Sequence, residues 1–162
     1  MEIKQAQTKN EIENIRVLFR EYEKFLGVDL CFQGFEKELA DLPGQYSPPY
    51  GQLFIALDNG IPAGCVAVRK IASDICEMKR LFVRPEARGK GLGRKLAQKT
   101  IVTAINFGYS CMRLDTLESL SDAVNLYTKL GFKKTLPYCI NPLEGAIFME
   151  LDLKGDSFLD RD

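Results

Sequence analysis

The sequence predicts an α/β (α+β) fold, in which a mixed central sheet has helices packed against it. The predicted elements follow the order strand, two helices, three strands, helix, strand, helix and two strands. The three early strands follow one another through short turns, as in antiparallel hairpins, whereas helical crossovers separate the later strands. The chain has 162 residues, of which 46% are hydrophobic and 27% charged, so one domain can bury a sizeable core.

The first third of the chain predicts a strand and two helices. Weak alternation over 2–7 favours a short strand. Thr8 and Glu11 form the capping-box pattern T-x-x-E, which predicts that a helix begins there. Apolar residues then recur at helical spacing until Gly27, which ends the run. A second, shorter helix is expected over 35–42.

The remaining elements are predicted from turn residues and from the change of hydrophobic period. Asp58-Asn59-Gly60 is a turn signal between two apolar runs and predicts a hairpin. The predicted strands are 53–57, 61–68, 75–83, 112–116, 133–136 and 146–153, and the later helices are 91–107 and 119–130. We expect a single domain over 1–153 and a polar, disordered tail over 154–162.

Composition excludes several classes of function. Lysine and arginine together number 22, as do aspartate and glutamate, so the chain lacks the excess positive charge of a nucleic-acid or membrane binder. The absence of histidine removes the Ser-His-Asp and Cys-His nucleophile systems and most zinc sites, and we expect no metal. The five cysteines form no CxxC pair, and no signal peptide or spanning segment is apparent. These features predict a cytoplasmic protein.

A glycine-rich turn between a strand and a helix is the most informative segment. It reads Arg88-Gly89-Lys90-Gly91-Leu92-Gly93-Arg94. Glycines let backbone N–H groups approach an anion closely, and the first turn of a helix leaves N–H groups unpaired and partially positive. Eight basic residues surround this helix start, opposed only by Glu86: Lys79, Arg80, Arg84, Arg88, Lys90, Arg94, Lys95 and Lys99. The turn therefore predicts a pyrophosphate site.

The spacing of the glycines distinguishes between the known phosphate-binding motifs. A dinucleotide fingerprint fails because its last glycine would fall on Arg94 or Leu96, and a Walker A loop fails because Lys90 is followed by glycine. The pattern that matches is R-x-x-G-x-G, formed by Arg88, Gly91 and Gly93. A solvated basic helix end is the alternative interpretation of the glycine string alone.

Two segments together resemble the GNAT N-acetyltransferase superfamily. The run from Glu77 to Gly93 is similar to its core motif, whose R-x-x-G-x-G turn holds the pyrophosphate of coenzyme A. Downstream, the run from Ala123 to Phe132 resembles its A-x-x-L-Y-x-x-x-G-F segment. The resemblance covers about residues 2–153. It implies a mostly antiparallel sheet of about six or seven strands, with helices on both faces and a splay between the fourth and fifth strands.

The resemblance also implies the site residues. A strand that parts from its neighbour, here Leu81-Phe82-Val83, would pair with the pantetheine arm and supply an oxyanion N–H. Glu77 would be the general base, and alternation places it on the face of Lys79, Leu81 and Val83. Tyr127 would be the general acid for the leaving thiolate and would also contact the cofactor. The residues expected to bind acetyl-CoA are Leu81, Phe82, Val83, Arg88, Gly89, Lys90, Gly91, Leu92, Gly93, Arg94, Ser121 and Tyr127.

Structural alternatives remain for each of these residues. Glu77 could be a strand carboxylate paired with Lys79 or Arg80, and Tyr127 could be a core aromatic. Asp115 is interpreted as structural. The chain departs from the superfamily at Leu120, where many relatives have asparagine, and Ser121 is the expected replacement.

The acceptor is the least determined feature. The regions 21–42, 45–50 and 137–142 are rich in aromatic residues, and Glu23, Glu36 and Asp41 could attract a cation. We expect transfer of acetyl from acetyl-CoA to a small-molecule amine. The alternatives are a peptide or protein N-acetyltransferase and a non-catalytic coenzyme A sensor. A homodimer is compatible with the superfamily, although nothing in the sequence requires one.

Overall fold

A seven-stranded mixed sheet forms the centre of the protein, in a computed structural model that describes residues 1–155. Its strand order is β1-β2-β3-β4-β5-β7-β6, and each neighbouring pair is antiparallel except β4 and β5. The strands are β1 (Glu2–Gln5), β2 (Gln52–Asp58), β3 (Ile61–Ala72), β4 (Ile75–Val83), β5 (Cys111–Leu117), β6 (Lys133–Thr135) and β7 (Ala146–Asp152). The predicted mixed sheet is confirmed. The predicted tail lies mostly outside the described residues.

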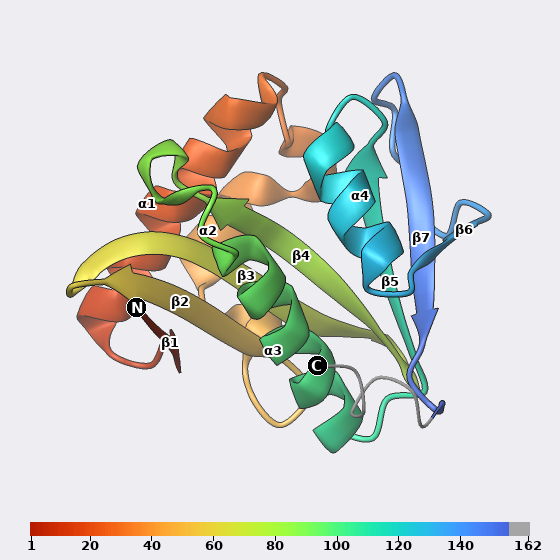
Figure 1. Cartoon of the computed structure of the whole chain (residues 1–162), viewed down its shortest axis with the longest axis horizontal. Coiled ribbons are helices and arrows are strands. Elements are labelled where there is room, and N and C mark those ends of the chain that lie inside the picture. Colours follow the sequence, from red (N-terminus) through yellow and green to blue (C-terminus); the bar gives the residue numbers. More distant parts are fainter. Residues whose placement is uncertain (156–162) are drawn as a thin grey trace.

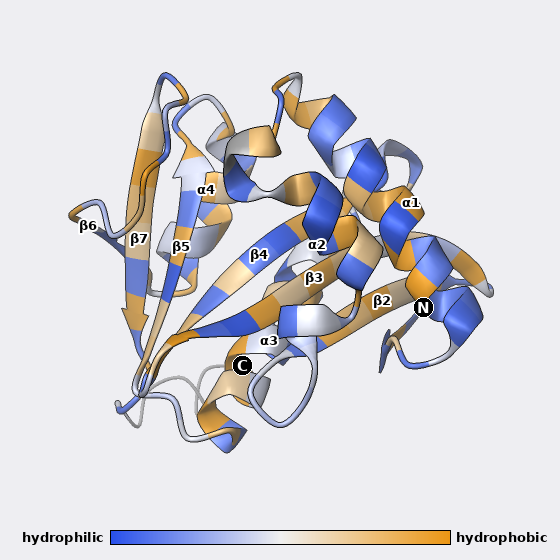
Figure 2. Cartoon of the chain, turned by 180° about the vertical axis from the view of Figure 1, so that it is seen from behind, coloured by the Kyte–Doolittle hydropathy of each residue, from blue (hydrophilic) through white to orange (hydrophobic). Residues whose placement is uncertain are grey.

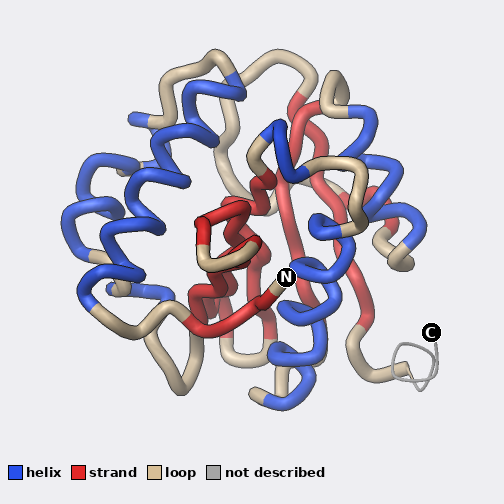
Figure 3. Tube along the Cα trace, turned by 60° about the vertical axis from the view of Figure 1, so that its left-hand side comes forward, coloured by secondary structure: helices blue, strands red, loops and turns tan. Residues whose placement is uncertain are grey.

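Helices cover both faces of this sheet, as Figure 3 shows. On one face, α1 (Lys9–Leu26) and α2 (Phe35–Asp41) pack on β2 and β3 through a cluster that includes Phe19, Phe35 and Ile55. On the other face, α3 (Leu92–Asn106) buries Leu96 and Ile101 against β2, β3 and β4, and α4 (Ser121–Lys129) lies beside β5. Figure 2 shows α1 and α2 with polar residues on their outer surfaces, as expected for amphipathic helices.

Local sequence accounts for the helix ends. Thr8 accepts a hydrogen bond from the backbone N–H of Glu11, whose side chain accepts one from Thr8 in return, so the predicted capping box starts α1. Gly27 ends α1 in the left-handed conformation, with φ of 69°. Three short 3₁₀ turns were not predicted: Cys31–Gln33, Gly44–Tyr46 and Pro85–Ala87.

The pairing of β4 changes along its length. Only Ile75–Glu77 pair with β5, opposite Cys111–Arg113, and no pairing joins the two strands further along within residues 1–155. Figure 1 shows β4 and β5 diverging from the end where they meet. This divergence exposes an edge of β4 from Met78 to Val83.

A β-bulge at Arg80 alters which side chains share a face. Cys65 pairs with Phe82 and Ala67 with Lys79, so one residue of β3 faces two of β4, and Arg80 has φ of 62°. As a result, Phe82 packs in the cluster beneath α1, whereas Leu81 and Val83 pack in the cluster beneath α3. The expectation that Glu77 shares a face with Leu81 and Val83 is therefore wrong, because simple alternation ignores the extra residue of the bulge.

Candidate active site

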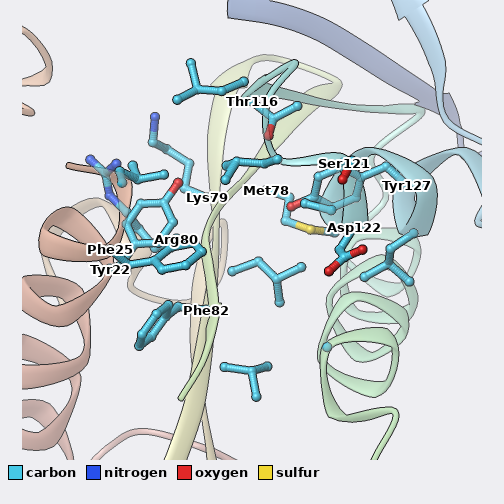
Figure 4. A pocket seen from close by; sticks show the side chains of 18 of the residues that line it. Tyr22, Phe25, Met78, Lys79, Arg80, Phe82, Thr116, Ser121, Asp122 and Tyr127 are labelled. Atoms are coloured by element: carbon cyan, nitrogen blue, oxygen red, sulfur yellow. The ribbon is translucent and has the colours of Figure 1, made fainter. Parts of the chain in front are cut away.

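The diverging strands open into a cavity of about 790 Å³ that reaches both faces of the sheet. Figure 4 shows side chains on either side of β4, with Tyr22, Phe25 and Phe82 towards α1 and with Met78 and Tyr127 towards α4. On the α3 and α4 side the cavity is lined by the glycine-rich turn and the start of α4. On the other side it is lined by α1, by Leu30 and Gln33, and by the loop residues Asn141 and Leu143.

The glycine-rich turn presents an uncapped helix start to this cavity. Gly91 is the N-cap of α3, with φ of 76°, and no side chain caps the helix. The amides of Leu92, Gly93 and Arg94 have no hydrogen-bond acceptor among residues 1–155. A Cβ at Gly91 would meet no atom within 4 Å, so the space in front of these amides is open. The arrangement is that of an anion-binding helix N-terminus.

The basic residues of the turn are divided between the cavity and the surface. Arg88 and Arg94 line the cavity. The Arg88 Nε donates to the Val83 carbonyl at 2.9 Å, and its guanidinium lies 4.6 Å from the centre of the Phe25 ring. Lys90 does not line the cavity, and its Nζ is 3.4 Å from Asp58 Oδ2. Of the predicted phosphate contacts, Arg88 and Arg94 are therefore better placed than Lys90.

Tyr127 lines the cavity from α4. Its side chain is mostly buried, with the residue 7% exposed, and its ring packs edge-on against Phe132 with centroids 5.7 Å apart. Its hydroxyl has no hydrogen-bond partner among the described residues. Burial raises the pKa of Tyr127 above its usual value, so the hydroxyl keeps its proton at neutral pH. Ser121, the expected replacement contact, lines the cavity at the start of the same helix.

Glu77 is buried beside the cavity rather than in its wall. It is 1% exposed and is not among the lining residues. One carboxylate oxygen accepts a hydrogen bond from Arg69 Nε at 2.7 Å, and the other accepts one from the Tyr138 hydroxyl at 2.6 Å. Burial alone would raise the pKa of Glu77, but Lys79, Arg69 and the Tyr138 hydrogen bond outweigh it and lower the pKa.

Two charged residues of the cavity wall differ from the expectations for them, since Asp115 was interpreted as structural and Lys79 as one of the basic residues around the start of α3. Asp115, at the diverging part of β5, accepts a hydrogen bond from Asn141 at 3.0 Å, while its other oxygen lies 4.0 Å from Lys79 Nζ. Lys79 has a side chain that is only 6% exposed and lines the cavity from β4. The charged residues Glu77, Lys79 and Arg80 inside one strand were the available signal for Lys79, whereas Asp115 needed the splayed geometry to be recognised.

The acidic residues expected to attract a cationic acceptor lie elsewhere. Glu36 forms a bidentate pair with Arg20, and Asp41 pairs with Lys37 at 2.9 Å. Glu23 accepts from the Leu30 backbone, and none of the three lines the cavity. The expected acidic acceptor pocket is therefore wrong. Among the aromatic residues of the regions 21–42, 45–50 and 137–142, Tyr22 and Phe25 line the cavity, whereas Tyr46, Tyr50 and Tyr138 do not.

No group of three or more potential ligands among the described residues could hold a metal ion. No helix over the same range is long and apolar enough to span a bilayer.

Comparison with known proteins supplies the family. A profile of the Acetyltransferase (GNAT) family matches residues 13–132. The chain is 43% identical to an uncharacterized N-acetyltransferase of Schizosaccharomyces pombe over 88% of this chain and 89% of the relative. It is 32% identical to an N-acetylaspartate synthetase of Danio rerio over 68% of this chain and 43% of that protein.

A solved structure shares the fold along nearly the whole chain. It is a protein of Salmonella typhimurium, solved with its cofactor acetyl-CoA. The TM-score is 0.73 and the identity 22%, over 96% of this chain and 95% of the other. The profile match, which spans most of the described residues, and the 43% identical relative show that the chain belongs to the GNAT acetyltransferase family.

Proposed function

We propose that this protein transfers the acetyl group of acetyl-CoA to the amine of a small molecule. The observation that carries the proposal is the continuity of the cavity, which runs from the uncapped start of α3, past Tyr127, through the gap between β4 and β5 to the α1 side. A ligand can thus place a diphosphate at one end and a reactive thioester in the gap.

The cofactor end fits the acidic and extended parts of acetyl-CoA. The amides of Leu92, Gly93 and Arg94 and the guanidiniums of Arg88 and Arg94 would hold the diphosphate. A Cβ on Gly93 would lie 3.8 Å from Val83 and Leu126, so a glycine here keeps the passage between β4 and α4 open. The unpaired edge of β4 at Leu81-Phe82-Val83 would pair with the pantetheine arm and donate an N–H to the thioester oxygen.

The reaction needs one proton to leave the acceptor and one to reach the thiolate. The amine nitrogen attacks the thioester carbonyl, a C–N bond forms, and the C–S bond then breaks with its electron pair on sulfur. Tyr127, kept protonated by burial, would give its proton to that thiolate. The proton from the amine passes to a carboxylate or to water, and Tyr127 is reprotonated from solvent.

Two carboxylates are candidates for the proton acceptor. Glu77 is the one that the family resemblance implies, but both of its oxygens already accept hydrogen bonds and it lies outside the cavity wall. A role for Glu77 would therefore pass through Lys79 or Tyr138. Asp115 lines the cavity, and its Oδ1 accepts no hydrogen bond from any described residue, so its geometry favours direct proton transfer.

The acceptor end favours a small molecule over a peptide. It is lined from three separate parts of the chain, namely α1, the turn at Leu30 and Gln33, and the loop at Asn141 and Leu143. The related N-acetylaspartate synthetase is named for a small N-acetylated product, which supports the same class of acceptor here. Peptide acetylation and coenzyme A sensing without turnover are the competing functions.

The test begins with acetyl-CoA binding by calorimetry and continues with an amine panel, monitored by release of the coenzyme A thiol. The panel contains small amines, amino acids and lysine-containing peptides. Small molecules with higher kcat/KM than any peptide support the proposal. Binding without turnover of any acceptor would favour a sensor, and preference for peptides would favour the second enzyme class.

A further inference from the structure

Lys79 is a buried cation at the acceptor end whose hydrogen-bonding capacity is unused. Its side chain is 6% exposed and lines the cavity. Its Nζ lies 3.7 Å from Glu77 Oε1 and 4.0 Å from Asp115 Oδ1, and it makes no hydrogen bond to any described residue. A buried ammonium normally has hydrogen-bond acceptors, because burying charge without them is costly.

The neighbouring buried charges are already matched with one another. Glu77 accepts hydrogen bonds from Arg69 and Tyr138, one on each oxygen. Arg80 forms a bidentate pair with Glu38, with N···O distances of 2.9 and 3.0 Å. Neither pair needs Lys79 to complete its hydrogen bonding. A lysine placed only to neutralise Glu77 would be expected to donate to it, yet the nearest oxygen is too distant for a hydrogen bond.

Other polar groups of the same end are also without partners. Gln33 lines the cavity, and its side-chain Oε1 is buried with no hydrogen-bond partner in the described structure. The Tyr22 hydroxyl has no partner there either, and burial raises its pKa to about 12, so it remains a donor. Figure 4 places Tyr22 and Lys79 on the same side of β4, facing α1. These groups can hydrogen-bond a polar ligand, and Lys79 sets its charge preference.

We infer that the acceptor is an amine that also carries a carboxylate, with Lys79 binding the carboxylate and Asp115 facing the amine. The inference rests on the proposed function, because it assigns the acceptor of that same site. Lys79 Nζ and Asp115 Oδ1 are 4.0 Å apart. Such a short separation of opposite charges matches a molecule whose amine and carboxylate are bonded to the same carbon, as in an α-amino acid. The ligand and the two side chains would then form an alternating arrangement of charges.

Other classes of small amine fit this end less well. A di- or polyamine would place its second cation near Lys79, where repulsion in a buried site disfavours binding. An apolar amine would leave the Lys79 ammonium without an acceptor and Gln33 Oε1 without a donor, so both desolvated groups would count against it.

The test compares matched acceptors on the wild-type protein and two variants. The probes are L-α-amino acids, the same amino acids as carboxamides, and the corresponding decarboxylated amines. For the best amino acid, the wild type is expected to show a kcat/KM at least about 10-fold above that of its carboxamide and its decarboxylated amine. Lys79→Met, which keeps the side-chain length, should lower kcat/KM for the amino acid about 10- to 100-fold and change the carboxamide less than about 3-fold. Lys37→Met is the control, because Lys37 is 84% exposed and pairs with Asp41 outside the cavity.

Each outcome is decisive. Equal turnover of amino acids, carboxamides and decarboxylated amines by the wild type would overturn the inference while leaving the proposed function intact. Acetylation of other small amines but of none of these probes would overturn the inference alone, and no acetylation of any amine, with acetyl-CoA bound, would refute both. Acetyl-CoA affinity measured on Lys79→Met reports whether the variant is folded. If Lys79→Met no longer binds acetyl-CoA, the wild-type protein alone tests the inference, through its kcat/KM for the amino acid relative to that for the carboxamide.

Discussion

The two ends of the cavity bind charge in different ways. The cofactor end uses backbone amides of Leu92 to Arg94 and exposed guanidiniums, with no buried charge of its own. The acceptor end uses the buried side chains of Lys79 and Asp115, set among the ion pairs of Glu77 and Arg80. Backbone amides tolerate changes in neighbouring side chains but not the loss of glycine, whereas a buried side-chain site depends on single residues. This difference predicts where substitutions will affect binding, chemistry or selectivity.

The largest effect is expected where the two ends meet, at Tyr127. Tyr127→Phe should lower kcat by about 10²- to 10⁴-fold, because the departing thiolate loses its proton donor. The acetyl-CoA affinity should change less than about 3-fold, since ring packing on Phe132 is retained. Steady-state kinetics and calorimetry measure the two quantities separately.

Tyr109→Phe is the matched control for that substitution. The Tyr109 hydroxyl donates to the Tyr50 carbonyl at 2.6 Å, outside the cavity, so its removal should cost about 1 kcal/mol of stability and leave kcat unchanged. If Tyr127→Phe retained the wild-type kcat, Tyr127 would be a packing residue and the thiolate would be protonated by another group.

At the cofactor end, substitution of Gly91 should have the largest effect on acetyl-CoA affinity. Gly91→Glu places a negative charge in front of the unpaired amides and should weaken acetyl-CoA binding on the order of 100-fold or more. Calorimetry with acetyl-CoA measures this effect directly.

Gly60→Glu provides the control for backbone strain. Gly60 has φ of 81° and open space around it, like Gly91 with φ of 76°, but it lies in the β2–β3 turn away from the cavity. Both substitutions should cost about 1 kcal/mol of stability for the left-handed conformation. Equal acetyl-CoA affinities in the two variants would exclude a diphosphate at the start of α3.

The two candidate proton acceptors at the acceptor end can be separated by pH. Asp115→Asn should lower kcat/KM about 100-fold at neutral pH, with recovery at alkaline pH where the acceptor amine is already unprotonated. Glu77→Gln should give a smaller loss that is uniform across pH, because Glu77 acts on the site through Lys79 and Tyr138.

The opposite pattern would reassign the base. A pH-dependent loss confined to Glu77→Gln, with Asp115→Asn close to wild type, would show that Glu77 takes the proton through an intervening group. Because interactions in the folded state lower the pKa of Glu77, the stability that its charge contributes is present above about pH 4.5 and is lost below it. Rates should therefore be compared at and above neutral pH, where that contribution is constant.

The cofactor end was predictable from sequence because it is contiguous. Seven consecutive residues, from Arg88 to Arg94, contain the glycines, the helix start and the cations, so local spacing alone indicated an anion site. The order of strands and helices was predictable for the same reason, since hydrophobic period and caps are local signals. Element ends differ by a few residues, as in β3, which continues to Ala72 beyond the predicted end at Val68.

The acceptor end was not predictable because tertiary structure assembles it. Gln33, Lys79, Asp115 and Asn141 come from separate elements, and no spacing connects them. The bulge at Arg80 also carries no clear sequence signal, yet it places Phe82 on the α1 face and Leu81 on the other. The acidic residues Glu23, Glu36 and Asp41 suggested a cationic acceptor only because their ion pairs and their positions were unknown.

The smallest expected effect concerns a single exposed cation at the cofactor end. Arg94→Ala should weaken acetyl-CoA binding about 3- to 10-fold, because an exposed guanidinium contributes modestly beside the backbone amides. Raising the salt concentration should reduce this difference by screening. Lys95→Ala is the matched control, since Lys95 is also exposed and adjacent but does not line the cavity. A loss at Arg94 as large as that at Gly91, or an equal loss at Lys95, would mean that side-chain charge rather than the helix start dominates diphosphate binding, and the contrast between the two ends would disappear.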